Sequence, residues 1–288
     1  LISKFASSKV KVCLSGDGGD ELFAGYNRYI VTEKIWKYIR LMPYQMRLMI
    51  SKILRSISPN KWNRLLKWCE ILLFRNNKYV HYGDKIHKGG ECLKSKTIED
   101  LYYFLISDLK TNYSNNLKNY ETQHMKIPNS NVSNLNSVEF LMRNDFINYL
   151  PNDILTKVDR AAMANSLETR MPFLSKNVIE ESWKIPHHLK IKHNQSKYLL
   201  KKIISEFIPT DYIDHIKKGF SIPLANWLRN DLEDWVESSI TKSKIEKYDI
   251  FDYKQIKTLW DDHKSEKFNN HGQIWNILIM QNWLEANI

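Results

Sequence analysis

The chain has 288 residues, of which 43% are hydrophobic and 26% charged, with a formal net charge of +11 at pH 7. This balance is typical of a globular protein and excludes a low-complexity or disordered chain. No apolar run approaches the ~18 residues that a membrane-spanning helix needs, so no membrane partner is expected.

The positive charge raises nucleic acid or an anionic substrate as a partner. It comes mainly from scattered lysines, without an Arg-rich stripe or an RNA-binding motif interleaved with aromatic residues, so we expect no nucleic-acid function. The three cysteines are odd in number and lack C-x-x-C spacing, which argues against a disulfide framework or a zinc site. The chain begins with Leu1 rather than Met, as a fragment would, and has no secretory signal at its start, so a cytoplasmic location is expected.

The opening stretch predicts a strand, a glycine-rich turn and a helix. Residues 9–14 (KVKVCL) are a short β-branched run, residues 15–21 (SGDGGDE) form the turn, and residues 22–29 can form a helix. Such a unit builds ligand sites at the carboxyl ends of strands in parallel α/β sheets. No clear strand follows for a long stretch, where amphipathic patterns predict helices over residues 35–53 and 62–74.

Helical periodicity returns at residue 137, and the apolar residues that fall near one face are Phe140, Leu141, Phe146, Ile147 and Leu150. Pro151 is expected to end this helix. Further helices are predicted over residues 153–167, after Ser196 as N-cap, and through the tail 251–288. The expected fold class is α/β, mostly helical in this chain. Because the predicted strands are too few for a complete sheet, most of the parallel sheet is expected upstream.

The turn at residues 15–21 combines glycines with acidic side chains. Glycines let backbone N–H groups approach an anion, but Asp17, Asp20 and Glu21 would repel a bare polyphosphate. A Mg²⁺ ion that bridges a carboxylate and pyrophosphate oxygens removes this contradiction. The alternative is a solvated acidic turn in which Gly18 and Gly19 serve only to allow positive φ.

Three blocks in the same order along the chain resemble the asparagine synthetase family. They are residues 14–29 (LSGDGGDELFAGYNRY), residues 149–160 (YLPNDILTKVDR) continued by 166–174 (SLETRMPFL), and residues 217–220 (KKGF) followed by Pro223 and Trp227-Leu228. The chain is therefore identified as resembling the C-terminal synthetase domain of the glutamine-hydrolysing family, truncated at its N-terminus. The resemblance implies an ATP-pyrophosphatase-type parallel-sheet domain, similar to the adenine nucleotide α-hydrolases, with many helices.

The same resemblance implies the organisation of the chain and its reaction. Residues 1–288 would be a partial synthetase domain: strand, acidic loop and helix over 1–34, a helical insertion over 35–136, and a helical C-terminal part with the Lys217 loop over 137–288. The implied enzyme is a carbon–nitrogen ligase with ATP and Mg²⁺. It activates a small-molecule carboxylate, aspartate in the type case, as an acyl-adenylate and releases pyrophosphate. Ammonia from glutamine then expels AMP.

Site residues are carried over position by position. Asp20 would be a Mg²⁺ ligand, and Ser15, Gly16 and Gly18 would border the pyrophosphate or substrate. Asp17 stands where well-studied members have Glu, which is proposed to orient or deprotonate the attacking amine, so the carboxylate here is shorter by one methylene. Lys217 matches the lysine that neutralises charge at the α-phosphate, with Lys218 as the adjacent alternative.

A charged cluster lies on or just after one predicted helix. The resemblance gives Glu168 a supporting catalytic role and assigns Asp159, Arg160 and Arg170 to binding of the substrate carboxylate. Asp159 and Arg160 are neighbours in sequence, so they need not share a partner on a helix. A structural ion pair between Glu168 and Arg170 that anchors the following turn is the alternative. His215 stands where the family has an arginine, two residues before Lys217.

The ATP signature Ser-Gly-Gly-x-Asp-Ser and an N-terminal catalytic cysteine do not occur in these residues. We expect both in an upstream glutaminase and ATP-loop portion of the same protein, and we expect the isolated chain to be inactive. Two alternatives stay open: a related amidotransferase that acts on a sugar or peptide carboxylate, and a non-catalytic remnant of the scaffold.

Overall fold

A computed structural model describes residues 1–73, 82–106, 135–213 and 222–288 of the chain. The chain divides into two compact units, each built from two stretches. Unit 1 comprises Leu1–Tyr38 and His124–Lys217, and unit 2 comprises Ile39–Gln123 and Lys218–Ile288. The fold is mostly helical, as the sequence predicted, and the described residues also contain a small parallel sheet, which is compatible with the expected α/β class.

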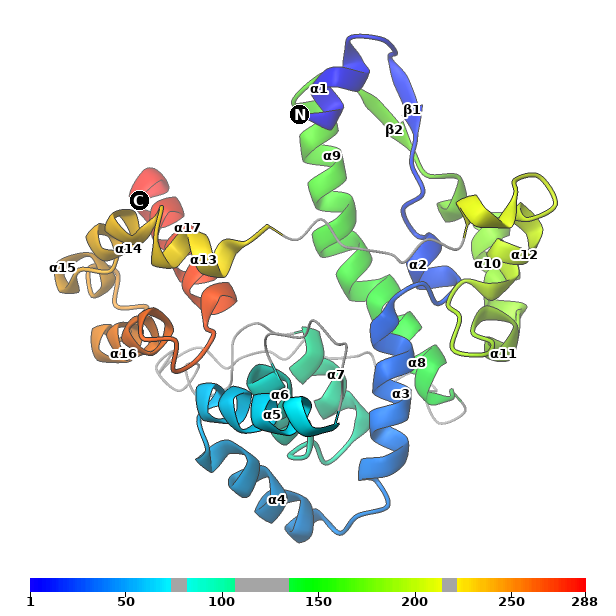
Figure 1. Ribbon diagram of the computed structural model, residues 1–288. Helices are drawn as coiled ribbons and strands as arrows, with labels where there is room; N and C mark the ends of the chain where they lie inside the picture. Colours follow the sequence, from blue (N-terminus) through cyan, green and yellow to red (C-terminus); the bar gives the residue numbers. More distant parts are fainter. Residues whose placement is uncertain (74–81, 107–134, 214–221) are drawn as a thin grey trace. The chain divides into compact units, whose positions relative to one another are not determined.

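Unit 1 contains the sheet, which joins the start of the chain to a segment far along it (Figure 1). Strand β1 (Val12–Leu14) pairs in parallel with β2 (Glu168–Arg170), with Cys13 opposite Thr169. The early helices of this unit are α1 (Ile2–Ser7), α2 (Gly19–Leu22) and α3 (Asn27–Ile39). The predicted order of strand, turn and helix is confirmed, but the helix predicted over residues 22–29 is wrong in its bounds, because α2 ends at Leu22 and α3 begins at Asn27.

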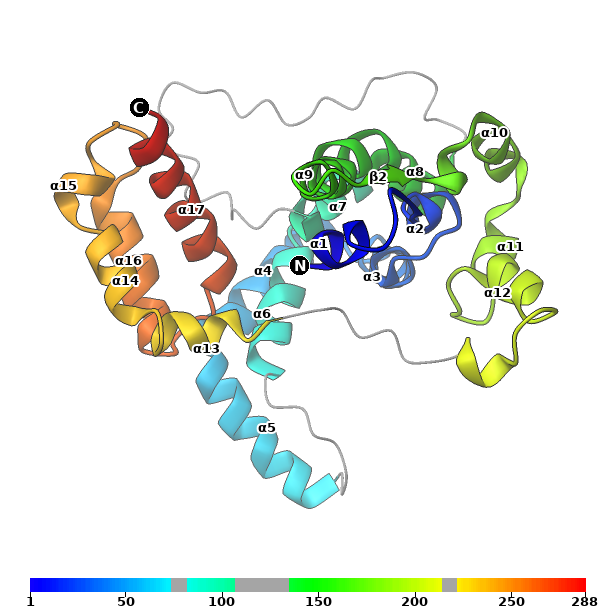
Figure 2. The same cartoon turned by 90° about the horizontal axis from the view of Figure 1, so that it is seen from above.

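A long helical run crosses unit 1 and appears nearly end-on in Figure 2. It consists of α8 (Ser137–Asn144), the π-helix η3 (Asp145–Leu155) and α9 (Thr156–Met163). Asn136 begins it with a capping box in which Glu139 bonds back to the cap. Apolar side chains of α8 and of the segment after β1 form the core, including Leu22, Phe23, Phe140 and Leu141.

The prediction that Pro151 ends a helix is wrong, because Pro151 lies inside η3. Proline breaks an α-helix through its missing N–H and its clash with the carbonyl four residues earlier. A π-helix bonds residues five apart, so that α-helical clash does not arise. The Thr156 hydroxyl also donates to the Pro151 carbonyl at 2.8 Å, and the run continues to Met163.

The rest of unit 1 consists of short helices after β2. They are η4 (Pro172–Leu174), α10 (Lys176–Lys184), α11 (His187–Lys190), α12 (Tyr198–Ile204) and η5 (Thr210–Tyr212). The N-cap of α12 is Lys197 rather than the predicted Ser196. Lys197 adopts φ of 53°, in the left-handed region, as do His193 and Asn194 just before it, so the chain turns sharply before the helix begins.

Unit 2 is entirely helical within the residues described. Its helices are α4 (Tyr44–Ser56), α5 (Pro59–Leu73), α6 (Tyr82–Cys92), α7 (Ile98–Ile106), α13 (Leu224–Arg229), α14 (Glu233–Ser239), α15 (Lys242–Ile245), α16 (Tyr253–Lys264) and α17 (His271–Asn287). One core joins the last five of these helices around Trp260, Leu259 and Leu278. The predicted tail helices are confirmed, whereas the stretch 35–53 is broken at Pro43, which begins α4.

None of the described helices combines the length and apolar character needed to cross a bilayer.

Candidate functional site

The acidic glycine loop, residues 15–21, leaves the carboxyl end of β1 beside the carboxyl end of β2. Leu14 pairs with Arg170, and the Ser15 backbone N–H donates to the Arg170 carbonyl oxygen at 2.8 Å. The carboxyl ends of neighbouring parallel strands form the usual ligand-binding edge of an α/β sheet. The pairing therefore brings the first and second sequence blocks together in space.

Glycine is required in this loop because the loop lies against the turn η4. Gly18 adopts φ of 87°, and a side chain there would collide with Leu174. A Cβ at Gly19 would come within 3.2 Å of the Phe173 ring. The loop and the Met-Pro-Phe-Leu segment after β2 thus form one packed structure, in which Phe23 also meets Phe173 edge to face.

Asp17 is held by a hydrogen bond inside the loop. The Ser15 hydroxyl donates to Asp17 Oδ2 at 2.6 Å, a short distance typical of a bond to an ionised acceptor. The Asp17 side chain is half-buried. Ser15 thereby limits the directions in which this carboxylate can point.

Asp20 is paired with a lysine that sequence reasoning missed. Lys197 Nζ lies 2.8 Å from Asp20 Oδ1, and both side chains are about one-quarter to one-third exposed. Gly25 makes room for this ion pair, since a Cβ at Gly25 would collide with the Asp20 carboxylate and the Lys197 side chain. The left-handed backbone of Lys197 follows from no local sequence pattern.

The last acidic residue of the loop, Glu21, is buried and bonds to Tyr26. Tyr26 donates to Glu21 Oε1 at 2.7 Å, and burial raises the pKa of the Glu21 carboxyl above its ordinary value. Burial and the neighbouring Glu21 likewise raise the pKa of the Tyr26 hydroxyl. The Glu21 carboxyl is therefore engaged by Tyr26 inside the protein, and Asp17 and Asp20 are the more accessible carboxylates of the loop.

Arg28 links Tyr26, next to the loop, to Asp145 in the long helical run. Its guanidinium lies 2.7 Å from Asp145 Oδ2 and stacks 4.2 Å from the Tyr26 ring centroid and 4.6 Å from that of Tyr149. Burial alone would lower the pKa of Arg28, but the Asp145 carboxylate raises it above its ordinary value. Removal of Arg28 would leave the fully buried Asp145 carboxylate without its cation, which is strongly destabilising.

The other predicted site residues lie farther out on the surface. Arg170 Nε donates to Glu168 Oε1 at 2.6 Å, with the two side chains 66% and 55% exposed, so the ion pair weighed as an alternative does form. Asp159 and Arg160 are exposed on α9 and make no ion pair with any residue that the structure describes. Lys217 and Lys218 lie outside the described residues.

The arrangement offers a pair of accessible carboxylates, Asp17 and Asp20, at the carboxyl ends of two strands. Mg²⁺ is commonly held by one or two carboxylates together with phosphate oxygens and water. Clusters of three or more His, Cys, Asp or Glu suited to a metal do not occur among the described residues. This donor set fits a metal that arrives with a polyphosphate.

Comparisons with known proteins agree on one family. The sequence model of the asparagine synthase family matches residues 1–285. The glutamine-hydrolyzing asparagine synthetase 1 of Bacillus subtilis is 32% identical over 290 residues, an alignment that covers 100% of this chain and 42% of that protein. A putative glutamine-hydrolyzing asparagine synthetase of Mycobacterium tuberculosis is 25% identical over 290 residues, covering 98% of this chain and 40% of the relative.

A more distant relative is the amidase chyE of Penicillium rubens, 21% identical over 264 residues, with 85% of this chain and 37% of that protein covered. No solved structure matches this chain. The chain spans about two fifths of the length of the curated relatives it matches.

Proposed function

This chain belongs to the asparagine synthase family, and from that membership we propose that it is the C-terminal part of an ATP-dependent ligase that converts aspartate to asparagine with ammonia from glutamine. The observation that carries the proposal is the acidic glycine loop packed on η4, with Asp17 and Asp20 accessible at the carboxyl ends of β1 and β2. The adenine site and the glutaminase would belong to an upstream portion of the same protein.

The proposed reaction has two displacements. A carboxylate oxygen of aspartate attacks the α-phosphorus of ATP and pyrophosphate leaves. Ammonia then attacks the acyl carbon and AMP leaves. Mg²⁺ would supply charge neutralisation at the leaving pyrophosphate.

The residues of this chain would bind and orient the reacting groups. Asp20 would hold the metal, with the Lys197 ammonium next to it as a fixed positive charge. Backbone groups of Ser15, Gly16 and Gly18 would border the pyrophosphate or substrate. Asp17, oriented by Ser15, would accept a proton from or position the attacking amine.

The remaining roles belong to residues on neighbouring segments. Lys217 would stabilise the negative charge that develops on α-phosphate oxygens. Arg170 and Arg160 would contact the substrate carboxylate, Asp159 would take part in substrate binding, and Glu168 would hold Arg170 in position through their 2.6 Å contact.

The test is an Asp20→Asn substitution in the full-length protein, assayed for asparagine formation over a range of magnesium concentrations. Because Asn keeps the shape and loses the charge, we expect kcat/KM to fall by about tenfold or more and the magnesium concentration for half-maximal rate to rise. Asp231→Asn is the matched control, since Asp231 is exposed and makes no ion pair with a described residue. Unaltered synthesis at every magnesium concentration would show that Asp20 holds no metal.

The upstream reading frame separates this proposal from a non-catalytic remnant. An intact Ser-Gly-Gly-x-Asp-Ser motif there supports the ligase, and a start codon near Leu1 supports the remnant. Release of AMP by the full-length protein with aspartate, compared with sugar or peptide carboxylates, identifies the acceptor.

A further inference from the structure

The outer side of helix α4, in unit 2, carries an apolar stripe. Met46, Met49 and Ile53 follow one another at spacings of three and four residues, which places them along one face of the helix. These residues are 40%, 58% and 56% exposed, and Leu41, just before the helix, is 74% exposed. We call Met46, Met49 and Ile53 the outer stripe.

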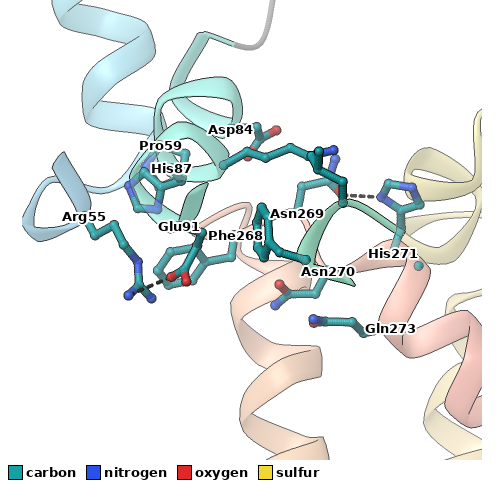
Figure 3. A pocket seen from close by; sticks show the side chains of 14 residues that line it. Arg55, Pro59, Asp84, His87, Glu91, Phe268, Asn269, Asn270, His271 and Gln273 are labelled. Carbon is teal, nitrogen blue, oxygen red and sulfur yellow. Dashed lines mark hydrogen bonds and ion pairs between the residues drawn. The ribbon is translucent and has the colours of Figure 1, made fainter. Parts of the chain in front are cut away.

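The inner side of α4 is polar, which reverses the usual arrangement of a surface helix. Arg47 and Ser51 are buried, and the Arg47 guanidinium donates to the Ser95 carbonyl oxygen at 2.7 Å. One turn after Ser51, Arg55 Nη1 lies 2.7 Å from Glu91 Oε1 of α6, at the wall of a pocket (Figure 3). Polar contacts thus hold α4 to the rest of unit 2, and its apolar face lies on the surface.

The segment around α4 lacks acidic residues. Although lysines are scattered through the chain, residues 34–69 contain nine Lys or Arg and no Asp or Glu, so they carry +9 of the net charge of +11. In unit 2, Arg40 precedes Leu41, and Lys52 follows Met49 by three residues on the same side of α4. Both cations are exposed, and neither makes an ion pair with a described residue.

This combination of apolar and positive residues favours one kind of partner. An exposed apolar stripe bordered by basic residues is typical of helices that lie on anionic membrane surfaces. A second copy of the chain would bring Arg40 and Lys52 near like charges, which opposes pairing through this face. Nucleic acid would contact the cations and leave the apolar stripe in water. An amphipathic helix of a protein partner binds in a groove, whereas the stripe lies on the convex side of one helix.

We propose that the outer stripe of α4 docks on an anionic lipid bilayer. Its three apolar side chains would enter the boundary between headgroups and acyl chains, and Arg40 and Lys52 would contact the acidic headgroups. The contact is peripheral and needs no helix that spans the bilayer. It goes beyond the proposed amide synthesis, whose candidate residues all belong to unit 1.

The experiment is vesicle flotation of the full chain, in which bound protein rises with the lipid and protein aggregates do not. Vesicles of phosphatidylglycerol and phosphatidylcholine in equal parts are compared with vesicles of phosphatidylcholine alone. We expect the chain to bind the mixed vesicles only, and to bind them less tightly as the salt concentration rises, because salt screens the attraction between the cations and the headgroups.

Substitutions at exposed positions test the stripe without removing core contacts. Met49→Ser combined with Ile53→Ser should weaken binding to the mixed vesicles by about tenfold or more, because two apolar side chains no longer enter the lipid. Lys52→Gln should weaken it by about fivefold. The matched controls are Ile279→Ser on α17, a helix without Lys or Arg, and Lys254→Gln on α16, both exposed. Neither control should change binding.

Four results would overturn the proposal. The chain does not float with the mixed vesicles, or the double serine variant floats as well as the parent. The chain binds soluble polyglutamate and not the vesicles, which would assign this face to an acidic protein segment. The chain forms a dimer that the double serine variant converts to a monomer, which would assign the stripe to a second copy. None of these results depends on whether the full-length protein makes asparagine.

Discussion

His263 is fully buried in unit 2, next to Trp260 in the core formed by the last helices. Arg229 Nε donates to the His263 carbonyl at 2.8 Å, and its Nη2 lies 3.2 Å from the imidazole Nδ1. Burial, followed by the charge of Arg229, lowers the pKa of His263 to about 4. The imidazole is therefore neutral in the folded protein at any pH near neutrality.

This burial predicts a loss of stability in mild acid. The unfolded chain takes up a proton at His263 near pH 6.5, whereas the folded chain resists it down to about pH 4. The stabilisation is thus complete above pH 6.5 and lost progressively as the pH falls to 4, with a total of roughly 3 kcal/mol. Urea unfolding at a series of pH values measures it.

His263→Asn provides the comparison, because Asn does not titrate and can still accept from the Asn270 N–H that bonds Nδ1 at 3.3 Å. The variant should be less stable at neutral pH but should lose less stability between pH 6.5 and 4. An equal loss in both proteins would mean that other groups cause the acid sensitivity.

At the same scale, the two glycines of the acidic loop should differ in their tolerance to substitution. Gly18→Ala places a Cβ against Leu174 at a positive φ, so we expect the free energy of unfolding to fall by roughly 1 to 3 kcal/mol. Gly16→Ala is the matched control: nothing lies within 4 Å of its added Cβ. Urea unfolding of both variants measures the loss in free energy of unfolding. Equal losses would contradict the packing of the loop against η4.

Among the elements, strong local patterns were predicted from sequence and long-range pairings were not. The strand–turn–helix order of the opening followed from a β-branched run that stops at clustered glycines. Strand β2 was missed because Glu-Thr-Arg has no apolar alternation, and it forms only through pairing with β1. The prediction at Pro151 was wrong because proline indicates the end of an α-helix, whereas the helix at this position is a π-helix.

In the candidate site, too, the residues given by a local pattern were predicted and those brought together by long-range contacts were not. Asp17, Asp20 and the glycines are encoded within seven consecutive residues, so their type and spacing could be interpreted directly. The partner of Asp20, Lys197, comes from the other stretch of unit 1, and Arg28 meets Asp145 across a similarly long separation. Tertiary packing decides such pairs, and a single sequence carries no local signal for them.

On the scale of the whole molecule, the sheet is small and open. Strands β1 and β2 each have three residues, and Val12 and Leu14 are 39% and 72% exposed. The apolar Ile2 and Phe5 of the neighbouring α1 are exposed as well. A two-stranded sheet is marginal alone, and unpaired strand edges invite pairing with another chain.

We therefore expect the isolated chain to self-associate through this surface. Light scattering at increasing concentration should show oligomers, and Leu14→Lys should shift the chain toward the monomer because a charge on an edge strand opposes pairing. Leu65→Lys, which removes an exposed leucine from α5 in unit 2, is the control. Equal self-association of all three proteins would place the contact elsewhere.

The pairing of β1 with β2 also has a consequence for the order of events during synthesis. β1 ends at Leu14, whereas its partner begins at Glu168 and the turn that supports the loop ends at Leu174. The acidic loop is translated well before β2 and η4, so its supporting contacts cannot form until those two segments have been translated as well. A nascent chain that stalls before β2 would thus expose Asp17 and Asp20 before they reach their positions in the folded site. The site could bind a ligand only after β2 and η4 have been translated.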